Sequence, residues 1–291
     1  MEFQKLRDRA HEDVDGKRGT RLWSRGLLRV LTGSLLAVVF LIAAACGDVD
    51  IDLGSDDDAP VETRDASFAV GSSSKLVVDT FNGAVTVIAG PEGTIRVQAT
   101  LKRADKLDYE ADQSGDTVRV KAEKHSGINL RNSGATVEIT APPSTTVELK
   151  TSNGSIEVRG LQGSGVLRTS NGKVVVQDFT GGLEASSSNG GIEVTGLKGS
   201  VDLETSNGSI SFSGELTPGS RNDLKTSNAG VTAQLEGTPS VTLDASTSNG
   251  KVTSDLPVQM DSAGDTKLTG TIGDGEAELK IRTSNGSITI R

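Results

Sequence analysis

Asn-Gly dipeptides recur seven times along this chain, and six of them lie in a repeated Ser-Asn-Gly block. The repeated asparagines, including one in Ser-Asn-Ala, follow one another at intervals of 18, 18, 18, 21, 21 and 36 residues. They are Asn153, Asn171, Asn189, Asn207, Asn228, Asn249 and Asn285. An earlier copy stands at Asn82. A fixed period of about 20 residues indicates a chain built from stacked copies of one structural unit.

Apolar and polar residues alternate on both sides of each repeated asparagine. The third residue after it is Val or Ile in every copy: Val85, Ile156, Val174, Ile192, Ile210, Val231, Val252 and Ile288. Alternation with β-branched residues is the pattern of a half-buried strand. Each period therefore holds two short strands, one running into the Thr-Ser-Asn-Gly turn and one running out of it.

Two topologies are compatible with this unit. Asn-Gly is a strong hairpin signal, which favours a meander of hairpins. In a β-solenoid, by contrast, every residue lies beside its equivalent in the next coil, and this explains why distant copies match position by position. We therefore predict an all-β, single-domain β-solenoid with coils of about 18–21 residues, two short strands per coil and Thr-Ser-Asn-Gly turns.

The repeated asparagines have a structural and a functional interpretation. Stacked side-chain amides can pass hydrogen bonds from coil to coil, which predicts a buried ladder inside the turn. The alternative is a polar stripe that binds a ligand. The glycine after each asparagine is expected to supply a positive φ.

The N-terminal region has the features of an export signal. Residues 1–29 carry eight Lys/Arg, and an uncharged apolar run from Val30 to Ala45 follows. Ala43-Ala44-Ala45-Cys46 resembles the bacterial lipobox, in which the cysteine receives a lipid. The resemblance implies a signal peptide over residues 1–45, removed on export, and a lipid anchor on Cys46. The alternative is a free cysteine in a membrane helix.

An acidic segment follows Cys46 and precedes the repeats. Its low hydrophobicity and its run of aspartates favour a solvated tether over residues 46–65, with the repeat domain at 66–291. Without residues 1–29 the chain keeps 22 Lys/Arg and 34 Asp/Glu, a net charge of −12. Nucleic-acid binding requires a basic surface, so this balance argues against it.

The chain offers little material for catalysis. His125 is the one histidine after Cys46, so neither a nucleophilic triad nor a His/Cys metal site is expected. Acidic residues stand five positions before several repeated asparagines: Glu184, Asp202, Asp223 and Asp244. On successive coils they would form an outward row, either solvated or holding calcium, which prefers carboxylate oxygens.

Residues 90–143 interrupt the period and are predicted to be an irregular part of the same solenoid. Loops at 103–109 and 125–131 are the expected places for function there, because loops on a rigid scaffold often carry it. The sequence ends at Arg291 directly after a strand, without an evident cap. Because open strand edges invite association, we predict end-to-end self-association.

The repeated Thr-Ser-Asn-Gly pattern, Ala141-Pro142-Pro143 and the closing block around Asn285 resemble a bacterial family known as the putative adhesin, or β-strand repeat domain of unknown function. The resemblance covers residues 66–291. It implies a β-solenoid, often outside the cell behind a lipobox, and supplies no catalytic residues.

Three functions follow from these features. The first is a non-enzymatic envelope lipoprotein that presents a repetitive surface for adhesion or for binding a surface glycan or envelope protein. It would be exported and anchored on the outer side of the cytoplasmic membrane or at the cell surface. The second is a scaffold or sensor of another envelope protein. The third is a calcium-dependent polysaccharide-active enzyme.

Overall fold

The computed structural model describes residues 60–125 and 133–291. Cys46 and most of the acidic segment lie outside this range. Over the described residues the chain is all-β, as predicted, with 22 strands and one short 3-10 helix, η1 (Ala104–Lys106). None of the described helices could cross a membrane.

Each repeat contributes a leading strand, which runs into the Thr-Ser-Asn turn, and a trailing strand, which leaves it. The leading strands are β2 (Lys75–Thr80), β8 (Thr146–Thr151), β10 (Gln162–Thr169), β12 (Thr180–Ser187), the end of β13 (Ile192–Thr205), β15 (Arg221–Lys225), β17 (Val241–Thr247) and β21 (Ala277–Thr283). The trailing strands are β3 (Val85–Ala89), β9 (Ile156–Arg159), β11 (Val174–Gln177), the start of β13, β14 (Ile210–Leu216), β16 (Val231–Leu235), β18 (Val252–Ser254) and β22 (Ile288–Ile290).

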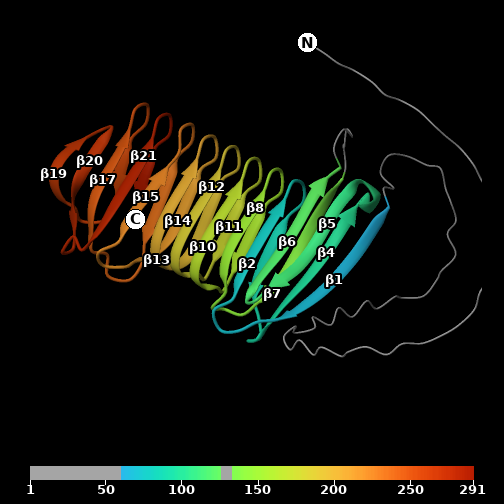
Figure 1. Ribbon diagram of the computed structural model, residues 1–291. Helices are drawn as coiled ribbons and strands as arrows, with labels where there is room; N and C mark the ends of the chain where they lie inside the picture. Colours follow the sequence, from blue (N-terminus) through green and yellow to red (C-terminus); the bar gives the residue numbers. More distant parts are fainter. Residues whose placement is uncertain (1–59, 126–132) are drawn as a thin grey trace, which may run out of the picture. The chain divides into compact units, whose positions relative to one another are not determined.

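Equivalent positions of neighbouring repeats pair in parallel. Leu167 of β10 lies opposite Leu149 of β8 on one side and Ala185 of β12 on the other. Trailing strands pair in the same way, with Val174 between Ile156 and Ile192. This register belongs to a solenoid-like stack of repeats (Figure 1) and not to a meander of hairpins.

The core lies between the leading and trailing strands. Alternate residues of both point inward, and Leu167, Val174 and Leu203 are fully buried. Removal of their apolar surface from water stabilises the stack by about 25 cal/mol per Å². Successive coils lie about 4.8 Å apart, so branched aliphatic side chains fill the interior layer upon layer.

The order of the coils differs from the order of the sequence at the C-terminal end. Strand β21 pairs with β15 on one side and with β17 on the other, and β22 lies between β16 and β18. The final repeat is therefore inserted between the two repeats that precede it. The 36-residue interval before Asn285 equals two periods of 18, but it does not correspond to two successive coils.

The 71 residues between Asn82 and Asn153 are nearly four periods long, but they do not form four coils between the two asparagines. Strand β2 pairs directly with β8, so these two asparagines are neighbours. The intervening residues extend the stack beyond β2 and β3. They form β4 (Thr94–Lys102), β5 (Leu107–Ser114), β6 (Thr117–Lys124) and β7 (Gly134–Ala141).

This extension begins with parallel strands and ends with antiparallel ones. Strand β6 continues from β2 and β7 from β3, both in parallel, whereas β5 pairs with β6 and β4 with β7 in the antiparallel sense. Strand β1 (Val61–Ala69) pairs with β4 and is outermost. Five residues of β1 fall within the range assigned to the tether. The loop expected at 103–109 contains η1 and the start of β5.

Arg291 is not an open end of the stack. Its backbone N–H donates to the carbonyl of Ala233, and its carbonyl accepts from Leu235. At the C-terminal side the last strands are instead β20 (Lys267–Ile272), antiparallel to β17, and β19 (Gln259–Gly264), whose residues are all exposed. The premise of the predicted end-to-end pairing at Arg291 was therefore wrong.

Candidate functional site

The repeated asparagines form one continuous ladder of side-chain amides. In each step the Nδ2 of one asparagine donates to the Oδ1 of its neighbour, at 2.5–2.9 Å. The spatial order is Asn82, Asn153, Asn171, Asn189, Asn207, Asn228, Asn285 and Asn249. The structure thus brings together all seven asparagines that the sequence singled out.

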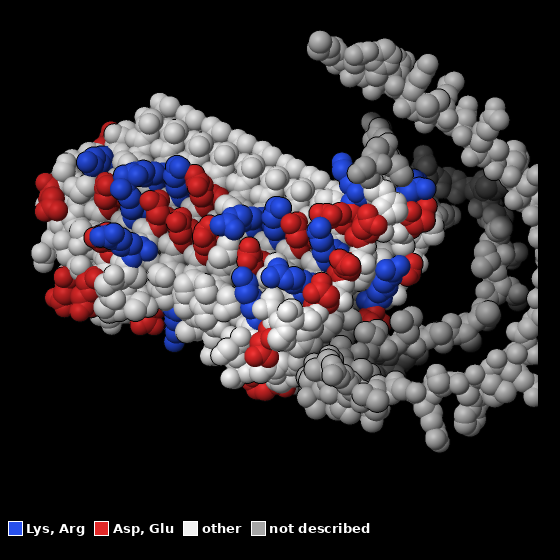
Figure 2. All heavy atoms as spheres, viewed as in Figure 1, with Lys and Arg blue, Asp and Glu red and all other residues white. Residues whose placement is uncertain are grey.

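The ladder is exposed and not buried, contrary to the sequence-based prediction. All seven of the predicted asparagines are exposed, and Asn82 is half-buried. The turns project beyond the layers of the core, so water reaches the amides from outside. The turns along the upper rim of Figure 1 are white in Figure 2, a rim without charge in this view.

A second ladder, of buried hydroxyl groups, lies two residues before the asparagines. Its members are Thr151, Thr169, Ser187, Thr205, Thr226, Thr283 and Thr247. Each hydroxyl donates at 2.8–3.3 Å to the carbonyl of the residue that follows the asparagine in the adjacent coil. The recurrence of Thr or Ser at this one position is the sequence signal that indicates this bonding.

The turn glycines are required by the close approach of the coils. A Cβ on Gly172 would lie 1.8 Å from the carbonyl oxygen of Gly154, and one on Gly154 would lie 1.6 Å from that of Gly83. The expectation of a positive φ holds at Gly83 alone among the Asn-Gly glycines. Positive φ occurs instead at the opposite corner of the coil, for example at Gly163 and Gly181.

The four carboxylates proposed to hold calcium do not form one row. Glu184, Asp202 and Asp223 are neighbours, but Lys280 of the inserted repeat lies between Asp223 and Asp244. Basic side chains also pair with this face: Arg168 Nη2 lies 2.5 Å from a Glu184 carboxylate oxygen. Figure 2 shows acidic and basic side chains alternating along it. No cluster of metal-ligating residues occurs in the described part of the chain.

The surroundings of Asp202 raise the pKa of its carboxyl group. Partial burial raises its pKa above the ordinary value, and the charges of Asp223 and Glu184 raise it further. Lys225, which bonds Glu204 at 2.5 Å, acts in the opposite direction. Glu184 and Glu204 on this face are thus ion-paired, whereas Asp202 is affected mainly by burial and by like charges.

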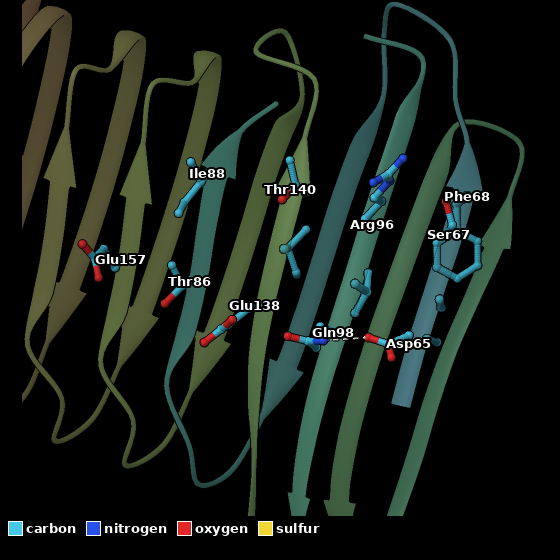
Figure 3. Close-up of a pocket in the computed structure, with 14 residues that line it drawn as sticks. Asp65, Ser67, Phe68, Thr86, Ile88, Arg96, Gln98, Glu138, Thr140 and Glu157 are labelled. Atoms are coloured by element: carbon cyan, nitrogen blue, oxygen red, sulfur yellow. Dashed lines mark hydrogen bonds between the residues drawn. The ribbon is translucent and has the colours of Figure 1, made fainter. Parts of the chain in front are cut away.

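A groove of 790 Å³ crosses the outer side of the trailing strands at the β1 end of the stack (Figure 3). It extends over β9, β3, β7, β4 and β1. Its polar and charged lining residues are Asp65, Ser67, Thr86, Arg96, Gln98, Glu138, Thr140 and Glu157. Ile88, 43% exposed, adds an apolar patch.

Cross-strand register arranges these side chains in two rows. One row follows the pairings Asp65–Gln98, Gln98–Glu138, Glu138–Thr86 and Thr86–Glu157. The other follows Ser67–Arg96, Arg96–Thr140 and Thr140–Ile88. Neighbouring side chains in a row are thus spaced by the strand separation of about 4.8 Å. The groove offers a fixed grid of hydrogen-bonding groups.

Two opposite charges in the grid are unpaired. Arg96 and Glu138 make no ion pair with any described residue, and in Figure 3 they point away from each other. Asp65, by contrast, accepts from Gln98 at 3.0 Å, and Glu157 pairs with Arg159. A guanidinium and a carboxylate without partners can both hydrogen-bond to a ligand. The sequence-based prediction placed function in loops of this region and missed the grid, since β1, β4 and β7 lie outside the regular repeat.

The stacked repeats match the model of a known protein family. The family model for the Toastrack DUF4097 domain matches residues 145–291, just over half of the chain. The chain belongs to the Toastrack DUF4097 family. The match begins immediately before β8, so the Toastrack model omits β1 to β7, although β2 and β3 continue the same stack. The resemblance to the putative-adhesin repeat family drawn from the sequence is confirmed.

Several solved structures align with this chain at low identity. A putative cell adhesion protein from Clostridium sporogenes is 12% identical, with a TM-score of 0.36 over 79% of this chain and 99% of its own. A putative adhesin from Bacteroides fragilis is 13% identical, with a TM-score of 0.39 over 80% and 97%. A putative lipid binding protein from Parabacteroides distasonis is 15% identical, with a TM-score of 0.34 over 80% and 98%. No curated protein sequence matches the chain.

Proposed function

We propose that this Toastrack protein is an exported lipoprotein of the bacterial envelope that binds a surface glycan or envelope protein without catalysis. Cys46 carries the lipid, the segment between Cys46 and β1 serves as the tether, and the folded domain from β1 onward presents the binding surface. The anchor is inferred from the lipobox-like sequence before Cys46. It places the protein on the outer side of the cytoplasmic membrane or at the cell surface.

The two-row grid over β1, β4, β7, β3 and β9 is the observation that supports binding most strongly. Its polar groups come from five strands whose mutual pairing fixes their positions, so little entropy is lost when a partner binds. The lining combines three carboxylates with one guanidinium. This mixture favours a partner rich in hydroxyl or amide groups over a polyanion. This lining contains no histidine or cysteine, so a nucleophile–base pair that uses either residue is missing from it.

Removing both unpaired charges of the groove is expected to weaken binding strongly. In cells that express the full chain, Arg96→Ala with Glu138→Ala should lower adhesion to immobilised envelope glycans and proteins roughly tenfold or more, because each charged hydrogen bond contributes about 1.5–3 kcal/mol. Lys225→Ala with Glu204→Ala is the matched control, since it also removes one base and one acid, but outside the groove.

The two double variants together test whether the partner binds in the groove. Wild-type adhesion that survives in the groove variant, or falls equally in both, would show that the partner binds elsewhere. Circular dichroism of both variants should remain that of the wild type, because all four side chains are exposed.

A further inference from the structure

The chain carries seven Asn-Gly dipeptides, and this dipeptide is prone to spontaneous deamidation. The glycine nitrogen loses its proton to solvent base and forms a bond to Cγ of the asparagine. The Cγ–Nδ2 bond breaks, and ammonia leaves with a proton from water. Water then opens the resulting cyclic imide to aspartate or isoaspartate. Glycine favours the reaction because no Cβ hinders the approach of its nitrogen.

We propose that Asn249, at the free end of the amide ladder, is a site of such modification, and that the ladder protects the inner asparagines. Reaction requires the side-chain amide to rotate toward the glycine nitrogen and that nitrogen to lose its proton. Hydrogen bonds that hold either group oppose both movements.

The inner asparagines are held at both reacting groups. Asn171 donates to Asn153 and accepts from Asn189, at 2.6 Å in each case. The N–H of the following Gly172 donates to Thr169 Oγ1 at 3.2 Å. The same arrangement recurs at Asn189 and Asn207, whose glycines donate to Ser187 and Thr205.

Asn249 lacks most of these restraints. It donates to Asn285 at 2.9 Å, but its Oδ1 accepts no hydrogen bond from a described residue. Thr247 Oγ1 donates to Gly286, and no bond from the Gly250 N–H to this hydroxyl is formed. Asn285 is intermediate, because its Oδ1 accepts from Asn249.

The modification would alter the last step of the ladder. A carboxylate at position 249 has no N–H to donate, so its oxygen would face the Oδ1 of Asn285 without a hydrogen atom between them. Isoaspartate would also insert a methylene group into a turn that approaches the neighbouring coil closely. A Cβ on Gly250 would already lie 2.0 Å from the Gly286 oxygen.

Peptide mapping tests this proposal on the intact protein. The protein is incubated at mildly alkaline pH, and deamidation is followed by mass spectrometry after digestion with trypsin, which places every Asn-Gly pair in a different peptide. We expect Asn249 to react roughly tenfold or more faster than Asn171, Asn189 and Asn207, since the latter must break two further hydrogen bonds. Protein unfolded in urea should show similar rates at all these sites.

Removal of the end asparagine should move the reactive site inward. In Asn249→Ala, Asn285 becomes the end of the ladder and should deamidate faster than in the wild type. Ser248→Ala, in the same turn, should leave its rate unchanged. Equal rates at Asn249 and the inner asparagines in the folded protein would overturn the proposal, and so would an unchanged rate at Asn285 in Asn249→Ala.

Discussion

Replacing Gly172 with alanine is expected to lower the free energy of unfolding by roughly 3 kcal/mol or more. The added Cβ would lie 1.8 Å from the oxygen and 2.3 Å from the carbon of the Gly154 carbonyl. Both atoms are backbone atoms of a coil that is itself paired on its other side. The coils can therefore separate here only by breaking the asparagine and threonine ladders. Thermal and urea unfolding followed by circular dichroism would measure the loss.

Gly264→Ala is the matched control for this substitution. Gly264 lies in the exposed strand β19, and a Cβ there would have no atom within 4 Å. Its effect should remain within about 0.5 kcal/mol, as for ordinary surface substitutions. Equal stability of the two variants would show that the coils are not packed as closely as the structure indicates.

Deleting residues 277–291 is expected to disrupt the C-terminal third of the stack, although they are the last residues of the chain. They form β21 and β22, which separate β15 and β16 from β17 and β18. Leu279, Ile281 and Ile290 are buried there. Without this coil β17 and β18 lose the strands that join them to the rest of the stack. Limited proteolysis should cleave the truncated protein within residues 221–276, where the full chain resists.

Single substitutions provide a graded control for the deletion. Ile281→Ala, in the inserted coil, should cost about 2–5 kcal/mol because a fully buried side chain leaves a cavity. Met260→Ala, in β19 at the end of the stack, should cost less than about 0.5 kcal/mol because that side chain is 64% exposed. A truncated protein that resists protease as well as the full chain would contradict the inserted order.

The strands and their inward faces could be read from the sequence because each coil repeats the same local pattern. Val174 and Ile192 occupy equivalent positions and lie side by side. The order of the coils could not be read in this way, since the pattern gives the shape of a coil and not its neighbour. An interval of 36 residues fits two coils in succession, and it fits equally a β19–β20 hairpin followed by a returning coil.

The candidate sites could be predicted only where they did not depend on the order of the coils or on how far the turns project. The asparagine ladder was predicted because it needs only identical residues at identical positions. Its exposure was not, because burial depends on how far the turn projects beyond the core. The predicted row of four carboxylates does not form, because Lys280 lies between Asp223 and Asp244. Arg96 and Glu138 line the same groove because β4 and β7, which lie outside the repeat, pair in the antiparallel sense, and no periodicity predicts that register.

Protease shaving of intact cells that express the wild type or Cys46→Ser tests the proposed function most directly. Wild-type protein is expected to be cleaved at the cell surface, whereas the variant, which cannot receive the lipid, should be released into the medium or lost. A wild-type protein protected until the envelope is opened would contradict binding to outside surfaces. The repeat domain would then be a scaffold or sensor for another envelope protein.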